Sequence, residues 1–465
     1  MSLSIAIIGA GPSACALACF LSERDIACLV FDDAKKPGLL VGESLIPAAM
    51  PIIRRLGIEQ EVAAISSVKK GAALRHGTEG TRVDFEFRDL GKGISDYAYN
   101  IPRPQFDNIL RARAEALGVR FVTHKAKVEK CDDSQQAELQ LADESLAAAG
   151  LARSSQPDLL VDATGRSRLF SRTLGLAAKR GPRNDVAHFA HYSNFDADSA
   201  LDGQVVISVL DCGWSWQIPL GDTTSVGVVL DGQAAKAYGN CATSRLENVI
   251  SSNGILNKPD RHRISEVKTY SNYQLMSDQA SGPGWILLGD ALGFVDPMLS
   301  PGVFMALESA RLMDKLVFKQ GGLQQKGSVR YYKKMAEWHS AWSSLIEYFY
   351  DGRMLALGAM RPEKTSRDSS FSLSNLPQAI QKLPDAIVSS VLSGLVSGAG
   401  TRSKFNQKML KHACVLLPDK STPVSDYAIR DFPKGKGAVD GQQFKSAISE
   451  FNKASIKKDS NEMAA

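Results

Sequence analysis

The sequence lacks the features of several protein classes. No apolar run approaches the roughly 18 residues that a membrane-spanning helix needs, since the best candidate, residues 386–400, is rich in Ser and Gly. Charge of one sign is also weak, with 55 Lys or Arg against 50 Asp or Glu. Aromatic and basic residues are not interleaved as they are on surfaces that stack bases. We therefore expect neither a membrane span nor a nucleic-acid partner.

Cysteine is scarce and scattered. The chain has seven cysteines, an odd number, and none forms a C-x-x-C pair. This pattern predicts buried thiols rather than disulfides or a zinc site. His188 and His191 are spaced for opposite faces of a strand, and no third ligand lies within reach in the sequence. We therefore predict that the protein has no metal site.

A secretory signal is also missing. The strand-like run at residues 4–8 begins almost at Met1, which leaves no room for the charged and apolar regions of a signal peptide. We therefore expect a cytoplasmic protein. Hydrophobic residues make up 44% of the 465 residues, enough apolar mass for two or three packed domains.

The chain opens with a βαβ pattern around a glycine-rich loop. Residues 4–8 and 28–31 are buried-strand runs, and residues 12–24 have helical composition. The loop between them directs backbone N–H groups and a helix N-terminus at a pyrophosphate. An acid follows the second strand, where it accepts hydrogen bonds from a ribose. The pattern predicts a dinucleotide site that includes Gly9, Gly11, Ala14 and Asp32.

Along the rest of the chain, the pattern of predicted strands and helices changes twice. From about residue 186 to residue 278, short β-like runs separated by Asp-Gly and Gly-Asp turns predict a mostly antiparallel sheet. The α/β pattern continues on both sides of this region. Helices are predicted over residues 45–56, 104–117, 302–319 and 328–360, and further strands over 82–88, 159–161 and 284–288.

Two short segments narrow the choice of dinucleotide. Asp162-Ala163-Thr164-Gly165 and Gly289-Asp290-Ala291 each follow a buried strand, and Arg103 stands before a helix. Together with the glycine loop, this ordered set resembles the FAD-dependent aromatic hydroxylase superfamily. The resemblance implies FAD as the cofactor, bound through Gly9, Gly11, Ala14, Asp32, Arg103, Asp162, Gly165, Gly289 and Asp290.

Three longer motifs resemble those of the flavin-dependent halogenases. They are a Gly-Glu-Ser loop at residues 41–47, Trp-x-Trp-x-Ile-Pro at 214–219, and Phe-x-x-Pro-x-x-Ser-x-Gly at 294–302. The resemblance covers roughly residues 1–355. It implies Glu43 and Ser300 as catalytic residues, Ser44, Pro297 and Gly302 as flavin contacts, and Trp214 and Trp216 as a wall between flavin and substrate. The alternative for the two tryptophans is a purely structural place in or against the core.

Lys69 lies at the distance after the Gly-Glu-Ser loop at which the halogenases have a lysine beside the substrate. The resemblance implies that this ammonium polarises the transferred oxygen or halogen species. The family's flanking Phe-Pro is replaced by Ser67-Val68 in this chain. A surface pair of Lys69 and Lys70 is therefore the alternative interpretation.

Pro301 departs from the halogenase pattern, which has Ser or Thr before the last Gly of the third motif. In that family, successive backbone N–H groups at this point bind chloride, as an anion nest does. Proline has no N–H to donate. A halide would then be held by Gly302 alone, at a loss of about 1.5–3 kcal/mol. The substitution predicts weak halide binding.

The sequence therefore favours an FAD-dependent monooxygenase of the halogenase-like group. We expect FADH2 and O2 to form a C4a-hydroperoxyflavin that oxygenates an electron-rich aromatic substrate, either small or peptide- or carrier-bound. The alternative is a halogenase that chlorinates or brominates an aromatic natural-product precursor, and a third hypothesis is a non-catalytic flavoprotein. A flavin reductase that supplies FADH2 is a candidate partner. The basic segment after residue 400 is interpreted as a solvated tail, with partner docking as its alternative.

The expected fold is α/β, with a Rossmann-like FAD-binding domain of the glutathione-reductase type. An antiparallel β-sheet substrate domain is inserted into it, and a helical region follows. The expected boundaries are 1–80, 100–180 and 280–330 for the FAD-binding domain, 81–99 and 181–279 for the sheet domain, 331–430 for the helical region and 431–465 for a disordered tail.

Overall fold

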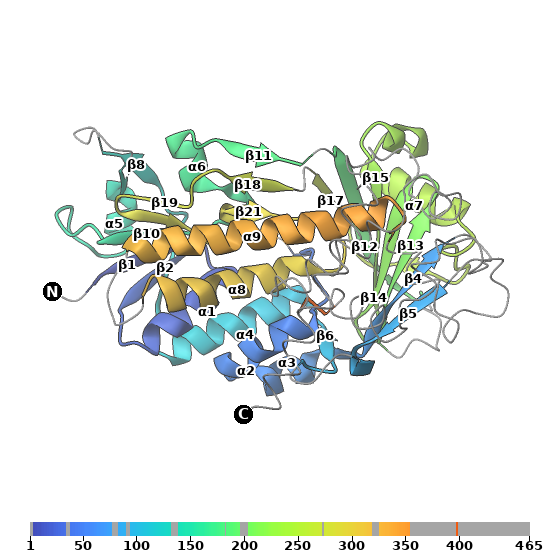
Figure 1. Cartoon of the computed structure of the whole chain (residues 1–465), viewed down its shortest axis with the longest axis horizontal. Helices are drawn as coiled ribbons and strands as arrows, with labels where there is room; N and C mark the ends of the chain where they lie inside the picture. Colours follow the sequence, from blue (N-terminus) through green and yellow to red (C-terminus); the bar gives the residue numbers. More distant parts are fainter. Residues whose placement is uncertain are drawn as a thin grey trace, which may run out of the picture.

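The computed structural model places two large β-sheets at opposite ends of the molecule, with helices packed beside and between them (Figure 1). It describes residues 3–33, 38–76, 82–89, 94–131, 138–181, 183–195, 203–271, 274–318, 325–353 and 397–398. Within these ranges, no helix has the length and apolar character needed to cross a membrane. The same ranges contain no cluster of three metal-ligating side chains.

The six-stranded sheet contains the βαβ opening. Its order is β19-β20-β10-β1-β2-β7, and all neighbours are parallel except β19 and β20. The central strands are continuous apolar runs because helices cover parallel sheets. The strands are β1 (Ile5–Ile8), β2 (Cys28–Asp32), β7 (Arg120–Thr123), β10 (Leu159–Asp162), β19 (Ser281–Gly282) and β20 (Trp285–Leu287).

Four long helices support this sheet and point toward the other one. Helix α1 (Pro12–Ser22) contacts both α4 (Arg103–Ala116) and α8 (Pro301–Leu316). Pro12 and Pro301 each occupy the first helical position, where the missing N–H group of proline has no helical partner to lose. Helix α9 (Gln325–Tyr350) packs on α8 and extends toward the second sheet (Figure 1).

The eight-stranded sheet is mostly antiparallel, as the turn-rich sequence predicts. Its main order is β16-β12-β15-β14-β13-β4-β5, and β17 also pairs with β12. Only the pair β13 and β4 is parallel among these strands. The strands are β4 (Gly71–His76), β5 (Arg82–Glu86), β12 (Asp185–Ser193), β13 (Val205–Leu210), β14 (Gly213–Pro219), β15 (Thr224–Asp231), β16 (His262–Arg263) and β17 (Lys268–Ser271).

Short elements complete the described part of the chain. The remaining strands form three small sheets: β3 (Ser67–Lys69) with β6 (Ala98–Asn100), β8 (Val128–Lys130) with β9 (Leu139–Leu141), and β11 (Ala178–Arg180), β18 (Leu275–Ser277) and β21 (Gly293–Phe294). The remaining described helices are η1 (Pro47–Ala49), α2 (Met50–Leu56), α3 (Glu59–Ile65), η2 (Phe87–Asp89), α5 (Asp143–Ala148), η3 (Gly165–Ser167), α6 (Leu169–Leu174), η5 (Ala234–Tyr238), α7 (Ala242–Ser252) and η6 (Gly289–Ala291).

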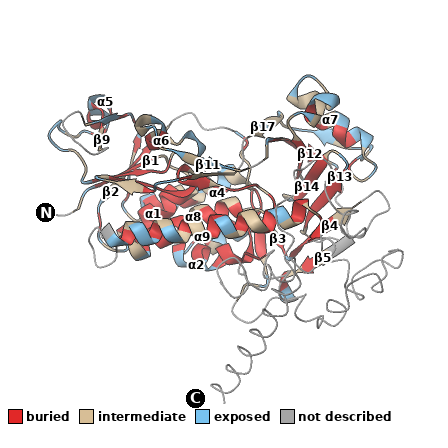
Figure 2. Cartoon of the chain, turned by 45° about the horizontal axis from the view of Figure 1, so that its top comes forward, coloured by how far each residue is buried: buried red, intermediate tan, exposed pale blue. Residues whose placement is uncertain are grey.

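One hydrophobic core joins the two sheets. It contains Ile7 and Trp285 from the six-stranded sheet and Trp214 and Trp216 from the eight-stranded sheet. Figure 2 shows that α1 and α8 are largely buried, whereas α9 exposes one side. A smaller cluster lies under α7, on the other face of the eight-stranded sheet. The shared core fixes the relative position of the strand ends that meet in the site described below.

The predicted fold class is confirmed, with corrections to its details. The sequence assigned residues 71–76 to the FAD-binding domain, whereas β4 pairs with β5 and β13 and is therefore part of the eight-stranded sheet. The prediction of buried thiols is confirmed for Cys15 and Cys19, but Cys28, Cys131 and Cys212 are half-buried, Cys241 at the N-cap of α7 is exposed, and Cys414 lies outside the described residues. The proposed helical region after residue 353 and the proposed tail lie outside the described residues, apart from residues 397–398.

Candidate active site

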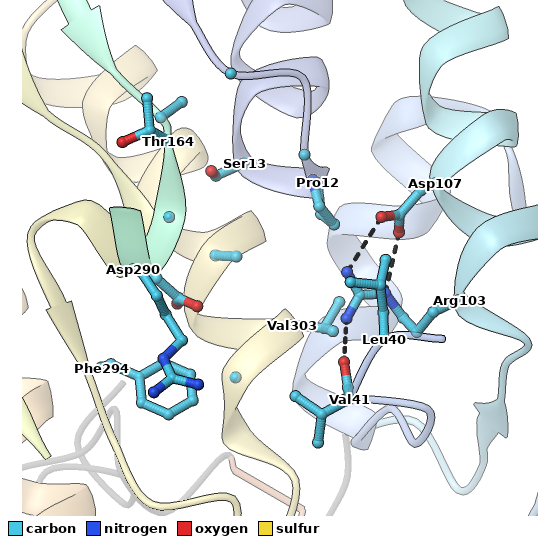
Figure 3. A pocket seen from close by; sticks show the side chains of 18 of the residues that line it. Pro12, Ser13, Leu40, Val41, Arg103, Asp107, Thr164, Asp290, Phe294 and Val303 are labelled. Atoms are coloured by element: carbon cyan, nitrogen blue, oxygen red, sulfur yellow. Dashed lines mark hydrogen bonds and ion pairs between the residues drawn. The ribbon is translucent and has the colours of Figure 1, made fainter. Parts of the chain in front are cut away.

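A cavity of about 630 Å³ is lined by residues from both large sheets. Figure 3 shows the part of this cavity that lies between the start of α1, Arg103 and Asp290. The glycine loop after β1 lies at one end, and strands β13 and β14 lie at the other. Twelve of the predicted site residues line it: Gly9, Gly11, Asp32, Glu43, Arg103, Gly165, Trp214, Trp216, Asp290, Pro297, Ser300 and Gly302. The predicted site residues that do not line it are Ala14, Ser44, Lys69, Asp162 and Gly289.

The glycine loop is shaped by two different steric requirements. Gly9 has φ +102°, and a Cβ there would lie 2.4 Å from the carbonyl oxygen of Ala163. Gly11 is the N-cap of α1, and a Cβ there would have no heavy atom within 4 Å, because the position opens into the cavity. The first N–H groups of a helix have no internal partner and favour an anion. This end of the cavity therefore suits a pyrophosphate.

Asp32, at the end of β2, lines the same end of the cavity and is mostly buried. Its carboxylate pairs with the guanidinium of Arg111 in α4. The same arginine also pairs with Glu115 one turn later in α4. The sequence did not identify Arg111, because it lies 79 residues from its partner in an ordinary helical segment.

Arg103 and Asp290 lie on opposite walls of the cavity (Figure 3). Arg103 donates to the carbonyl of Val41 and to both carboxylate oxygens of Asp107. Burial raises the pKa of Asp290 to about 6, and the positive charges of Arg103 and Arg166 partly offset that rise. The middle of the cavity thus offers cationic donors and a carboxylate, which are suitable partners for hydroxyl and phosphate oxygens.

Three predicted residues that do not line the cavity support residues that do; they are Asp162, Gly289 and Ala14. The Asp162 carboxylate accepts hydrogen bonds from both the N–H and the hydroxyl of Thr164 and from the N–H of Phe170. It therefore holds the turn that brings Gly165 to the cavity. Gly289 donates its N–H to Ser309 Oγ at 3.1 Å, and Ala14 is buried in α1.

The far end of the cavity is formed by a strained turn and two indole rings. Leu299 and Ser300 have φ values of +65° and +58°, the left-handed region that side chains disfavour. They precede Pro301, the first residue of α8. Trp214 and Trp216 lie on the same face of β14, with ring centroids 5.9 Å apart, and both line the cavity. The rings thus contribute both to the core and to the cavity wall.

Glu43 lines the cavity although it is almost fully buried. Its Oε1 lies 2.6 Å from Nε2 of His191, which belongs to β12 of the eight-stranded sheet. His188, on the opposite face, lies 2.9 Å from the Thr269 hydroxyl through its Nδ1. The alternation of the strand separates these two imidazoles, as the sequence predicts, but the contact between His191 and Glu43 was not anticipated.

Lys69 lies next to the cavity but does not line it. It is 2% exposed and donates hydrogen bonds to the Ser44 hydroxyl at 2.9 Å and to the Leu45 carbonyl at 3.1 Å. Burial lowers the pKa of its ammonium to about 7. The alternative of a surface lysine pair is therefore wrong for Lys69, although Lys70 is exposed. Since Ser44 directly follows Glu43, this short segment separates the Lys69 ammonium from the cavity.

Comparison with known sequences identifies the family. A sequence profile described as tryptophan halogenase matches residues 86–354, more than half of the chain. The chain belongs to the tryptophan halogenase family. A profile described as an NAD(P)-binding Rossmann-like domain matches residues 7–45, the glycine loop with its flanking strands.

Individual relatives are similar to this chain over about two thirds to three quarters of its length. The chain is 29% identical over 340 residues to the 1H-pyrrole-2-carbonyl-(peptidyl-carrier protein) chlorinase of Pseudomonas fluorescens, covering 66% of this chain and 74% of that one. It is 28% identical over 373 residues to the tryptophan 2-halogenase of Chondromyces crocatus, covering 75% and 68%. A flavoprotein/dehydrogenase of Cytophaga hutchinsonii has the same fold, with a TM-score of 0.71, 22% identity and coverage of 90% and 99%.

The family and the cavity agree on the cofactor. The protein is an FAD-dependent enzyme of the oxidoreductase type. The cavity fits the cofactor, because it runs without interruption from the glycine loop to the indole wall, and Gly11, Gly165 and Gly302 leave open space where a Cβ would stand. Which of the lining residues bind FAD is a proposal that rests on this fit.

Proposed function

We propose that the protein is a flavin-dependent halogenase that acts on an electron-rich aromatic substrate. The match to the tryptophan halogenase family and to two halogenating relatives supports this activity more than the monooxygenase that the sequence favoured. The observation that carries the proposal is the far end of the cavity, where the first turn of α8 opens beside Trp214 and Trp216. Reduced FAD, when bound, supplies the oxygen-activating chemistry.

The first turn of α8 is the proposed halide site. Gly302 lines the cavity, and no heavy atom stands within 4 Å of the place of a Cβ. The Ser300 side chain makes no cap hydrogen bond to the helix, and the Ser300 N–H already donates to the Pro297 carbonyl at 2.9 Å. Pro301 has no N–H. The halide therefore depends on Gly302 and the helix dipole, so we expect weak but saturable binding.

Lys69 is the proposed catalytic residue outside the cavity. Its ammonium contacts Ser44, and Glu43 on the other side of the same segment lines the cavity. We propose that the halogenating species passes this segment and is polarised by Lys69 beside the substrate. Charge-assisted hydrogen bonds from an ammonium are roughly twice as strong as neutral ones, which suits activation of a weak electrophile.

A carrier-bound substrate is the proposed finer specificity. One relative is named for a pyrrole ring held on a peptidyl-carrier protein, and another for tryptophan. A flavin reductase as the source of FADH2 is likewise a proposal. Pro301 specifically favours the second candidate function, an aromatic monooxygenase, because poor halide binding leaves oxygen transfer to the substrate as the competing outcome.

The test supplies the purified protein with FADH2 from a flavin reductase, oxygen and a panel of free and carrier-loaded aromatics, including pyrrole-2-carbonyl and tryptophan. Each reaction is run with bromide, with chloride and without halide, and products are identified by mass spectrometry. A product that gains bromine or chlorine in a halide-dependent way supports the halogenase. A product that gains only oxygen, at the same rate without halide, overturns that proposal in favour of the monooxygenase.

A further inference from the structure

Asp296 lies at the start of the turn that forms the far end of the cavity, and its side chain is completely buried. The carboxylate uses both of its oxygens. Oδ1 accepts the N–H of Met298 at 2.9 Å, which bends the chain as an Asx turn does. Oδ2 accepts hydrogen bonds from Arg183 Nη2 at 2.6 Å and from the Tyr350 hydroxyl at 3.1 Å.

The two donors come from distant parts of the fold. Arg183 precedes β12 of the eight-stranded sheet, and Tyr350 is the last residue of α9. The guanidinium carbon of Arg183 lies 3.6 Å from the centroid of the Tyr350 ring. Arg183 Nε also donates to Asp185 at 2.9 Å. The carboxylate of Asp296 is thus fixed by a sheet and a helix that both lie outside the turn it shapes.

The same tyrosine also holds the indole wall. Trp214 Nε1 donates to the Tyr350 hydroxyl at 2.7 Å, so one hydroxyl joins Trp214 to Asp296. Phe349, the neighbouring residue of α9, packs edge-on against the Trp214 ring. A continuous chain of hydrogen bonds therefore runs from the cavity wall through the end of α9 to the turn before α8.

The turn needs such support because of its backbone. Leu299 and Ser300 are consecutive left-handed residues with side chains. Such conformations persist at functional sites only where the surrounding structure fixes them. Asp296 fixes the first half of the turn through Met298, and the Ser300 N–H bond to Pro297 fixes the second half.

We propose that Arg183 and Tyr350 are positioning residues of the halide and flavin site, acting through Asp296. They fix the position of residues 297–302 relative to the Trp214 ring, so that the first backbone N–H of α8, which is that of Gly302, faces the cavity. This inference rests on the proposed function as a halogenase. Arg183 also acts electrostatically. Its positive charge compensates the buried carboxylate of Asp296, which would otherwise repel an anion bound a few residues away.

The decisive variants are Tyr350→Phe and Arg183→Met, with Arg183→Lys as the conservative rescue and Tyr348→Phe as the matched control on α9. Three quantities are measured: the dissociation constant of oxidised FAD, the visible spectrum of the bound flavin, and the KM for bromide. We expect Tyr350→Phe to raise the bromide KM about tenfold, the value of one lost hydrogen bond to a charged group. The flavin spectrum shifts as well, while the FAD dissociation constant stays within about twofold because the adenosine end is untouched.

Arg183→Met should have the larger effect on the bromide KM, and Arg183→Lys should restore part of it because the positive charge returns. The Tyr348→Phe control should match the wild type in all three quantities. An unchanged bromide KM and an unchanged flavin spectrum in Tyr350→Phe would overturn the inference. The inference would also be overturned if Tyr350→Phe lowered the FAD affinity and the melting temperature together and left the bromide KM without a separate change. That result would indicate a structural role alone.

The readouts separate this inference from the proposed function. If the wild-type protein forms no halide-dependent product, the halogenase proposal fails, whereas the flavin spectra of the variants still test the support of the turn. If the wild type halogenates and Tyr350→Phe leaves the bromide KM unchanged, only the inference fails. Should Arg183→Met not fold, Tyr350→Phe keeps the test complete, because it removes a single oxygen.

Discussion

At the scale of single residues, Lys69 combines full burial with a position next to the cavity. Among the described residues, no carboxylate contributes to its pKa, which burial lowers to about 7. Its hydrogen bonds are to the Ser44 hydroxyl and the Leu45 carbonyl, both neutral. A buried lysine without a stabilising anion is costly for the fold, and such strongly shifted groups gather at functional sites.

We predict that Lys69→Met abolishes product formation and leaves the FAD dissociation constant unchanged, because Lys69 does not line the cavity. Lys70→Met, at the exposed neighbour, is the matched control and should retain activity. Product is measured by mass spectrometry with an excess of FADH2. Turnover of Lys69→Met at the wild-type rate would remove the lysine from the mechanism.

The lowered pKa also predicts the pH dependence of catalysis. Polarisation by Lys69 requires the protonated ammonium, which is present below its pKa of about 7 and lost above it. We therefore expect kcat to fall as the pH rises through about 7. A kcat that instead rises through this range would mean that the neutral amine is the active form, acting as a nucleophile.

Protein stability should depend on the same group in the opposite direction. The folded-state pKa of Lys69 lies below that of an unfolded lysine, which is about 10.4. The unfolded chain thus binds more protons between these two values, so this group makes folding more favourable as the pH rises from about 7 to 10.4. We expect the difference in melting temperature between Lys69→Met and the wild type to favour the variant most below pH 7. This difference, measured by calorimetry, should decline toward pH 10. An offset that is constant with pH would show that Lys69 titrates normally.

At the scale of elements, the N-terminus of α8 is the proposed halide site. We predict that Pro301→Ala lowers the bromide KM about tenfold, since one N–H donor to a charged group returns. Pro301→Ser should do the same, and the comparison separates the N–H group from the hydroxyl. Steady-state kinetics with varied bromide give the measurement. Equal KM values for the wild type and Pro301→Ala would show that the halide binds elsewhere.

The elements themselves were largely predictable where local signals are strong. The sequence predicted helices over 104–117 and 302–319, and the structure has α4 at Arg103–Ala116 and α8 at Pro301–Leu316. Prolines at the starts and the apolar period define them. Helix α7 was missed, because its 11 residues lie inside a region of β-like runs, and its apolar face becomes evident only when it covers the second core.

At the scale of the whole molecule, the site is assembled from contacts between residues far apart in the chain. The sequence predicted the glycine loop, Asp32 and the two tryptophans because each belongs to a local motif. It did not predict that His191 contacts Glu43 across 148 residues or that Tyr350 contacts Asp296 across 54. These pairings depend on how the eight-stranded sheet and α9 dock on the FAD-binding part, and no local periodicity encodes that docking.

The contact between Glu43 and His191 tests this docking directly. Glu43 belongs to the loop that follows the βαβ opening, whereas His191 belongs to the eight-stranded sheet, so the pair joins the two parts at the cavity. Removing the imidazole leaves a buried carboxylate without that partner, which is destabilising. We predict that His191→Ala raises the FAD dissociation constant about tenfold and lowers the melting temperature of the holoenzyme.

The control variants decide between a specific contact and general damage to the sheet. His191→Gln can still donate a hydrogen bond and should recover most of the FAD affinity, while His262→Gln, at an exposed position on the neighbouring β16, should match the wild type. Equilibrium titration of the flavin and calorimetry give the two quantities. If His191→Ala binds FAD as the wild type does, the Glu43 loop is held by its backbone bonds alone, among them the one from Ile101 N–H to the Glu43 carbonyl.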